Sequence, residues 1–126
     1  MGSTGALVTA DLTETLKSVV NIYGDASGSY DTPVTLATYT VPSGKTFRFT
    51  GAIVGGNADG EFYLEVNATR IALIRNSASA RTISAQIWNP VTVNSGGIIS
   101  IKAKNVSYRK QSRQFEATIN GYNLNS

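Results

Sequence analysis

Apolar and polar residues alternate one by one along most of this sequence, which is the pattern of β-strands that bury one face. Residues 98–104 are an example, because Ile99, Ile101 and Ala103 alternate there with Ser100 and two lysines. The same period of two recurs in further segments, which are residues 34–41, 46–54, 61–66, 69–75, 82–88 and 114–122. The alternation therefore predicts about seven short strands that follow one another along the chain.

The apolar side of each predicted strand is expected to face a core. The residues expected inward are Phe47, Phe49, Gly51, Ile53, Phe62, Leu64, Val66, Ile71, Leu73, Ile83, Ala85, Ile87, Ile99, Ile101, Ala103, Phe115, Ala117, Ile119 and Gly121. In residues 61–65 the side chains expected outward are Glu61, Tyr63 and Glu65. Because every strand has one apolar face, two sheets must pack their inner faces together. We therefore predict an all-β fold, an antiparallel β-sandwich or jelly roll of about seven to eight strands with an N-terminal arm.

Tight turns are predicted between the strands. Residues 44–46, Gly-Lys-Thr, match the end of a phosphate-binding P-loop, which also needs a glycine five positions before Gly44. Tyr39 stands at that position, and the following residues alternate as a strand instead of a helix. We therefore predict a turn at Pro42-Ser43-Gly44. A two-residue hairpin turn is predicted at Asn67-Ala68, because asparagine tolerates a positive φ angle.

Residues 1–30 differ from the rest and are predicted to form an N-terminal arm and linker, while residues 31–126 form the sandwich. Asp11 and Glu14 have the spacing of a capping box at a helix start. Leu12, Leu16 and Val20 recur every four residues, which fits one side of a helix and also one side of a strand. We favour a short helix or extended arm, then a strand over residues 19–23 and a loop or linker over residues 24–33.

The composition narrows the chemistry that this domain can perform. Its 126 residues include no cysteine and no histidine, which excludes disulfides, thiolate nucleophiles, imidazole bases and Cys/His zinc sites. These groups carry most nucleophilic and acid–base catalysis, and we therefore expect no enzyme, no catalytic residue and no cofactor. No apolar run is long enough to span a bilayer, and no membrane partner is expected.

Two oxygen-rich segments are candidate calcium sites. Asp25 and Asp31 lie in one segment with serines between them, and Asp59 and Glu61 lie in the other. Calcium prefers oxygen ligands, but neither spacing matches an EF-hand loop. Aspartate and serine also form turns without any ion. We favour turns at both places and expect no bound metal.

Positive charge concentrates late in the chain, where Lys102, Lys104, Arg109, Lys110 and Arg113 fall within twelve residues. The net charge of +3 is mild and does not by itself imply nucleic acid. This basic patch fits either a solvated face or a contact with an acidic partner surface, such as the acidic arm of a neighbouring subunit. Aromatic residues for base stacking are sparse around it, and no nucleic-acid partner is expected.

Outward-facing aromatic residues suggest ligand binding or assembly. Tyr63, Trp88 and Tyr122 are the candidates, and Trp88 ends its predicted strand beside Asn89-Pro90. Amphipathic aromatic side chains are enriched at interfaces. One functional hypothesis is therefore a carbohydrate- or receptor-binding β-sandwich module, on a fibre tip or appended to a larger protein, with a glycan as its ligand.

Four segments resemble small β-sandwich virion proteins of tailed bacteriophages, which decorate or cement capsids. They are YTVPSGKTFRFTGAIVGG, GEFYLEVNATRIALIRNS, VTVNSGGIISIKAK and FEATINGYNL, and the likeness covers residues 34–124. Ala68 stands where the family-like hairpin has glycine. The resemblance implies a capsid decoration or cement protein on the virion surface. It also implies that the partner is the major capsid protein, that the protein is a homotrimer, and that an N-terminal arm grips the shell.

A capsid-binding arm needs apolar side chains on an adaptable segment. Residues 5–16 combine small residues with four apolar side chains, Leu7, Val8, Leu12 and Leu16. These four are the predicted capsid contacts. The alternative is that the same segment pairs inside the sandwich as an ordinary strand.

Overall fold

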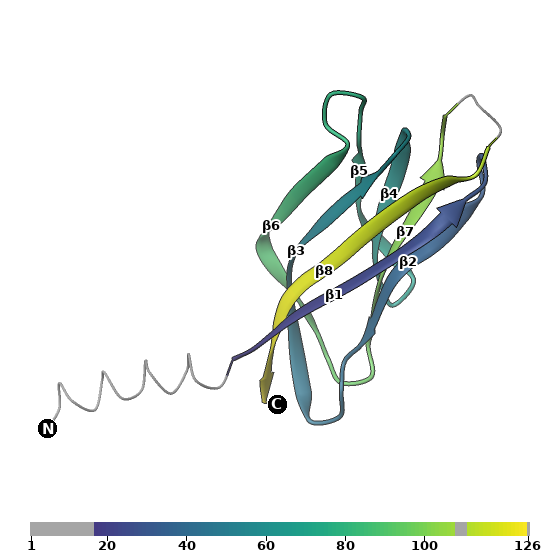
Figure 1. The fold of residues 1–126 in the computed structure, drawn as a ribbon. Coiled ribbons are helices and arrows are strands. Elements are labelled where there is room, and N and C mark those ends of the chain that lie inside the picture. The colour runs from purple at the N-terminus through teal and green to yellow at the C-terminus, as the bar shows by residue number, and fades with distance from the viewer. Residues whose placement is uncertain (1–16, 108–110, 126) are drawn as a thin grey trace, which may run out of the picture.

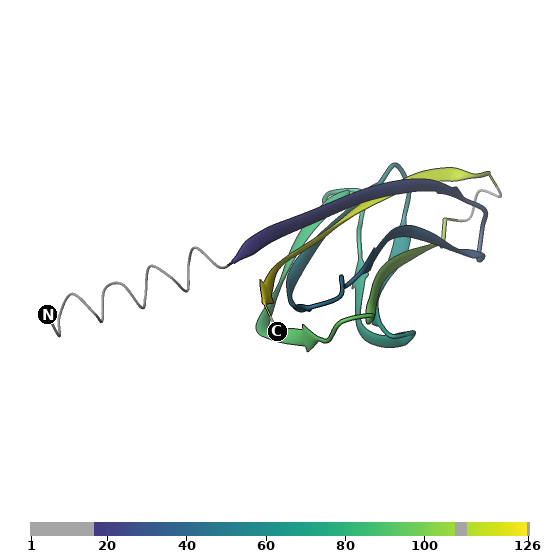
Figure 2. The same cartoon turned by 90° about the horizontal axis from the view of Figure 1, so that it is seen from below.

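The computed structural model describes residues 17–107 and 111–125, and the regular structure in these residues is all β-strand. The strands are β1 (Ser18–Gly28), β2 (Pro33–Thr40), β3 (Lys45–Gly56), β4 (Gly60–Val66), β5 (Thr69–Arg75), β6 (Thr82–Val93), β7 (Ile98–Asn105) and β8 (Arg113–Asn125). They form two antiparallel four-stranded sheets, sheet A in the order β1-β8-β3-β6 and sheet B in the order β2-β7-β4-β5. The two sheets pack face to face, as Figures 1 and 2 show. The predicted all-β sandwich is confirmed.

The strand pairing is that of a jelly roll. The first strand pairs with the eighth, the second with the seventh, the third with the sixth and the fourth with the fifth. β8 also pairs with β3, so it lies inside sheet A between β1 and β3. Among the described residues, no helix is long and apolar enough to cross a membrane.

The core lies between the sheets and is built from the inward side of each strand. Four phenylalanines, Phe47, Phe49, Phe62 and Phe115, are fully buried. The rings of Phe62 and Phe115 meet edge to face across the two sheets, with 5.8 Å between their centroids. The predicted inward residues of β4, β7 and β8 are confirmed as buried for Phe62, Leu64, Ile99, Ile101, Ala103, Phe115, Ala117 and Ile119.

A β-bulge reverses the predicted facing of the second half of β3. The alternation predicts Ile53 inward, but Ile53 is 38% exposed, while Ala52 and Val54 are buried. The pairing of β3 with both neighbours shifts between Phe49 and Gly51. One extra residue in a strand inverts the side of every residue beyond it, and the prediction for Ile53 is therefore wrong.

The facing of β5 is also opposite to the prediction. Ile71 and Leu73, which the alternation predicts inward, are 39% and 37% exposed. Ala72 and Ile74 pack against the core instead. Residues 71–74 are all apolar, so the sequence pattern does not distinguish the two faces of β5, and its register with β4 decides which face is buried. That pairing places Leu73 opposite Tyr63 on the outer side.

The sandwich begins earlier in the chain than the predicted boundary at residue 31. Ser18–Gly28 forms β1 and pairs along its whole length with β8. Val20 is buried, and Ile22 and Ala26 pack against the core. The strand predicted over residues 19–23 is therefore present, and residues 24–28 continue it instead of forming a linker. Residues 1–16, with the predicted capsid contacts Leu7, Val8, Leu12 and Leu16, lie outside the described residues.

Both predicted turns are present. Lys45 N donates to Pro42 O at 3.2 Å, and Gly44 has a φ angle of 78°. Asn67 and Ala68 have φ angles of 50° and 68°, and the central residues of a type I′ hairpin turn both need positive φ. Residues 44–46 therefore belong to a turn and to the start of β3, and they form no phosphate-binding loop.

Candidate functional site

Ion pairs cover the outer face of sheet B. Glu61 on β4 lies between Arg75 on β5, at 2.8 Å, and Lys104 on β7, at 3.6 Å. The Arg75 guanidinium and the Tyr63 hydroxyl both donate to the carboxylate of Glu61, and they lower its pKa. The pKa of Lys104 is raised by its hydrogen bond to Tyr63 and then by Asp31, which lies 3.5 Å away. The negative charge of Glu61 is thus compensated by cations on both neighbouring strands.

The three described residues of the predicted basic patch do not lie on one face. Lys102 lies 3.1 Å from Glu65, so both lysines of β7 have a carboxylate partner from another strand or loop. Arg113 begins β8 and therefore belongs to sheet A. Arg109 and Lys110 lie outside the described residues.

The candidate calcium ligands are engaged with other side chains. Asp59 Oδ1 lies 2.7 Å from Arg81 Nη1, and Asp25 Oδ2 accepts a hydrogen bond from Tyr23. Asp31 and Glu61 belong to the ion pairs of sheet B. Within residues 17–107 and 111–125, no group of three or more acidic side chains is placed to hold a metal ion.

The candidate aromatic residues lie in different environments. Tyr63 is only 5% exposed, because the Arg70 guanidinium covers its ring at 3.9 Å. Tyr122 is half-buried on sheet A, with Lys17 Nζ 4.9 Å from its ring centroid. Trp88, by contrast, is 87% exposed. Of these three residues, Trp88 offers the open aromatic surface.

Trp88 protrudes from an irregular part of β6. The pairing of β6 with β3 is interrupted over residues 87–90, which oppose the single residue Thr50. Pro90 in this segment has no N–H to donate, which suits an interrupted edge strand. β6 is one of the two edge strands of sheet A in the described part of the chain, and β1 is the other. An open edge with a protruding tryptophan has the features of a contact surface.

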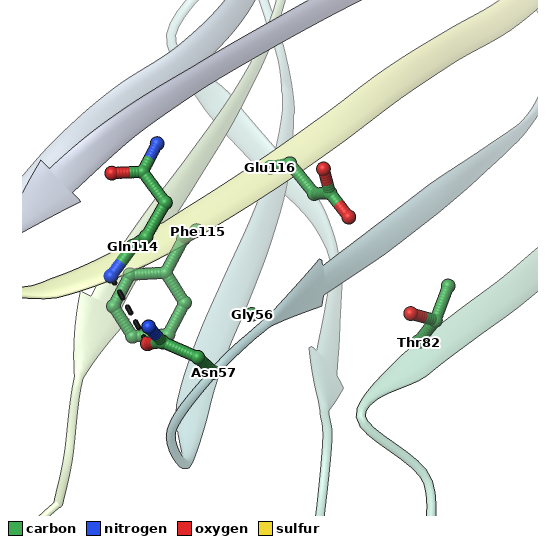
Figure 3. Close-up of a pocket in the computed structure, with 6 residues that line it drawn as sticks. All are labelled: Gly56, Asn57, Thr82, Gln114, Phe115 and Glu116. Atoms are coloured by element: carbon green, nitrogen blue, oxygen red, sulfur yellow. Dashed lines mark hydrogen bonds between the residues drawn. The ribbon is translucent and has the colours of Figure 1, made fainter.

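A hollow of about 280 Å³ opens on the outer face of sheet A, at one end of the sheet (Figure 3). Its lining residues come from β3, β6, β8 and the loop after β3, and they are Gly56, Asn57, Thr82, Gln114, Phe115 and Glu116. Gly55 on β3 is paired with Glu116 on one side and with Thr82 on the other. Because Gly55 has no side chain, the space between these two flanking side chains is open. A Cβ at Gly55 would lie 2.9 Å from Thr82 Oγ1.

Hydrogen bonds orient the polar side chains of the hollow. Asn57 Oδ1 accepts from Gln114 N at 3.1 Å (Figure 3), and Gln114 Oε1 accepts from Ser27 Oγ at 3.0 Å. Glu116 Oε2 accepts from Tyr23 OH at 2.9 Å. Each side chain is thus held through one of its two polar atoms. The other atoms, Asn57 Nδ2, Gln114 Nε2 and Glu116 Oε1, have no hydrogen-bond partner among the described residues.

Tyr23 fixes the position of the Glu116 carboxylate. Its hydroxyl donates to Glu116 and also lies 3.2 Å from Asp25 Oδ2. The hydrogen bond to Glu116, followed by desolvation and by the bond to Asp25, raises the pKa of Tyr23 to about 12. Tyr23 therefore remains a protonated donor throughout the neutral pH range.

The alternation of the sequence does not reveal the hollow, because strand pairing brings together positions 55–57, 82 and 114–116. The available signal is the pair Gly55-Gly56, since glycine inside a strand often marks a place where another group approaches closely. In the sequence that pair instead indicates the start of a loop. Of the polar residues that line the hollow, Glu116 is the one whose outward orientation the alternation predicts.

No protein-family model matches this sequence, and no curated protein matches it. Among solved structures, the fold is similar to a chain of the cyanophage Pam1 capsid asymmetric unit, with a TM-score of 0.51 and 14% identity over 84% of this chain and 85% of that chain. It is also similar to the insecticidal delta-endotoxin Cry8Ea1 from Bacillus thuringiensis, with a TM-score of 0.44 and 16% identity over 78% of this chain and 19% of that chain.

A third similar structure is the CBM36-1 domain of a multidomain xylanase from the hindgut metagenome of Trinervitermes trinervoides. Its TM-score is 0.40, with 12% identity over 87% of this chain and 97% of that chain. At such identities the likeness concerns the fold. The chain is thus a β-sandwich with distant structural similarity to a chain of a phage capsid.

Proposed function

We propose that this protein is a structural virion protein, a decoration or cement protein that binds the surface of a phage head. The observation that carries the proposal is the likeness to a chain of the cyanophage Pam1 capsid, which covers 84% of this chain and 85% of that one. The likeness therefore extends over the sandwich as a unit. The partner is the major capsid protein.

The described surface supports a role in binding. Glu61, Glu65, Arg75, Lys102 and Lys104 of sheet B form ion pairs, and Arg70 lies over the Tyr63 ring. Trp88, by contrast, is open on the edge strand β6. Tryptophan is one of the three residue types enriched at the energetic centre of protein interfaces. A small sandwich buries limited area at each contact, so a decoration protein gains affinity when several linked copies bind together.

The proposal predicts that the purified protein binds heads assembled from the major capsid protein encoded in the same genome. Sedimentation of the heads should recover the protein in a fixed number of copies per shell subunit, and bound protein should raise the temperature at which the heads open. Heads that are already saturated with unlabelled protein serve as the control and should take up none. Absence of the protein from the sedimented heads at saturating concentration would contradict the proposal.

We further propose that the protein is a homotrimer whose contact includes Trp88 at the open β6 edge. An exposed edge strand invites pairing, and a closed symmetric oligomer covers it. Tyr122 remains a candidate at the rim of this contact, whereas the burial of Tyr63 beneath Arg70 removes it from the contact.

Light scattering is expected to give a mass of three times 13.3 kDa, which is about 40 kDa. The Trp88→Ala variant should dissociate to monomers while its melting temperature changes little, because the side chain is 87% exposed. Tyr30→Ala, which truncates an aromatic side chain that is 42% exposed, is the matched control and should remain a trimer. A wild-type monomer, both free and on heads, would refute the trimer.

A further inference from the structure

We infer that the hollow on the outer face of sheet A, lined by Asn57, Thr82 and Glu116, is a binding site for a single unit of a neutral saccharide. This inference goes beyond the structural role in a virion and does not depend on it. The hollow and Trp88 belong to different parts of β6, since Thr82 begins the strand and residues 87–90 form its irregular part.

The polar groups of the hollow are complementary to hydroxyl groups. Glu116 Oε1 is an acceptor and Asn57 Nδ2 is a donor, and the Thr82 hydroxyl can act as either; none of the three has a partner within the described residues. A sugar hydroxyl both donates and accepts. Neighbouring hydroxyls of a sugar therefore match the chemistry of the carboxylate, the hydroxyl and the amide that line the hollow.

These groups are held in position before a ligand arrives. Tyr23 OH donates to Glu116 Oε2, and the backbone N of Gln114 donates to Asn57 Oδ1. Binding then requires little further ordering of side chains, and such ordering is one of the main costs of association. Gly55 supplies the open space, because any side chain at this position would project between Thr82 and Glu116.

The charge and size of the hollow restrict the ligand. Glu116 lines the hollow and Asp25 shares Tyr23 with it, so an anionic ligand is disfavoured. A single lining carboxylate is also a poor set of ligands for calcium, which takes six to eight oxygens. A volume of about 280 Å³ lies just below the range of ~300–1,000 Å³ found for pockets that hold drug-sized ligands, which suits one sugar ring.

The outer faces of the two sheets also differ in polarity, and the face of sheet A has more of the uncharged polar groups that bind a neutral sugar. On sheet B, the charged side chains are paired with one another across strands. The part of sheet A around the hollow presents amides and hydroxyls from Ser27, Asn57, Thr82 and Gln114 beside a single lining carboxylate, Glu116. Amide and hydroxyl groups bind neutral polar ligands without the large desolvation penalty of bringing charges together.

The test follows the side-chain amide signals of Asn57 and Gln114 by nuclear magnetic resonance of the ¹⁵N-labelled full chain. The probes are the free neutral sugars glucose, galactose, mannose, xylose and N-acetylglucosamine, and in a second arm oligosaccharides that end in the same units. At least one sugar is expected to shift these signals and the backbone amides of Gly55 and Gly56, with a Kd in the millimolar range that is typical of so small a contact. The two arms distinguish a free sugar from the terminal unit of a glycan.

Matched variants separate the hollow from the rest of the face. Thr82→Val keeps the shape of the side chain but loses its hydroxyl, and it should weaken binding about fivefold or more. Thr92→Val makes the same change on the same strand outside the hollow and should leave the Kd unchanged. Glu116→Gln removes a charged acceptor and should weaken binding about tenfold or more, with an unchanged melting temperature.

The inference is overturned if no sugar of either arm shifts the Asn57 and Gln114 signals, or if Thr82→Val and Thr92→Val bind alike. It is also overturned if calcium alone, and no sugar, produces the shifts. These outcomes are distinct from failure of the virion role. Thr82→Val and Glu116→Gln are expected to bind heads normally, and Trp88→Ala is expected to bind the sugar normally, because Trp88 does not line the hollow.

Discussion

An Ile101→Asp protein is expected not to fold. Ile101 lies at the centre of β7 with none of its surface exposed. Its neighbours on β2 and β4 are Ala37 and Leu64, and neither has a polar side chain that could pair with a carboxylate. A carboxylate there is buried without a counter-charge. The expected cost is about 4–5 kcal/mol or more, which is comparable to the whole free energy of unfolding of a domain, about 5–15 kcal/mol.

Ile98→Asp is the matched control, because Ile98 lies on the same strand and is 43% exposed. Its cost should not exceed about 1 kcal/mol, which is the spread of strand propensities. Circular dichroism and urea unfolding measure both variants. A soluble Ile101→Asp protein that unfolds cooperatively, or an equal loss of stability in the two variants, would contradict the assigned core.

An Asn105→Ala protein is expected to lose about 3–5 kcal/mol of unfolding free energy, because several buried polar groups lose their partners together. Asn105 is fully buried. Its Nδ2 donates to Gly28 O and to Gln111 O, both at 3.1 Å. Its Oδ1 accepts from Ser107 N at 3.0 Å and from Ser107 Oγ at 2.7 Å. This one side chain therefore ties the end of β1 to the segment between β7 and β8.

Two further variants serve as references for the loss of unfolding free energy expected in Asn105→Ala. Ser107→Ala removes one of the four hydrogen bonds and should cost about 1 kcal/mol. Asn21→Ala truncates an exposed asparagine on β1 that has no side-chain hydrogen bond within the described residues, and its effect should stay within about 0.5 kcal/mol. If urea unfolding shows Asn105→Ala to be no less stable than Ser107→Ala, the side chain does not hold these segments together.

The faces of β4, β7 and β8 could be predicted from the sequence because those strands alternate cleanly and carry no bulge in the relevant part. Ile53 could not, since Ala52, Ile53 and Val54 are all apolar and only the register shift near Thr50 decides which of them is buried. The same holds for Ile71, which lies at the register shift of β5 against β4. The alternation of residues divides a strand into two sides, and the pairing of the strand with its neighbours decides which side faces the core.

The candidate sites depended even more on pairing between strands that are distant in the sequence. The local charge count marks Lys102 and Lys104 as a basic patch, but Glu65 and Asp31 lie close to them only in the folded sheet. Asn105 follows the predicted strand and has the sequence character of a loop residue, although its burial makes it a structural junction. Trp88 does not end its strand as the sequence predicts, because β6 continues to Val93, and the exposure of Trp88 follows instead from the interrupted pairing over residues 87–90.

The nested pairing of the strands has a consequence for the order in which the protein forms during synthesis. β8 is the last strand of the described chain to leave the ribosome, yet it holds both β1 and β3 in sheet A. β4 and β5, joined by the turn at Asn67-Ala68, can pair early because their contacts are local. β1 must wait with an unpaired edge until β8 has been made. Its exposed polar residues, such as Asn21 and Asp25, limit aggregation of that waiting strand with other nascent chains.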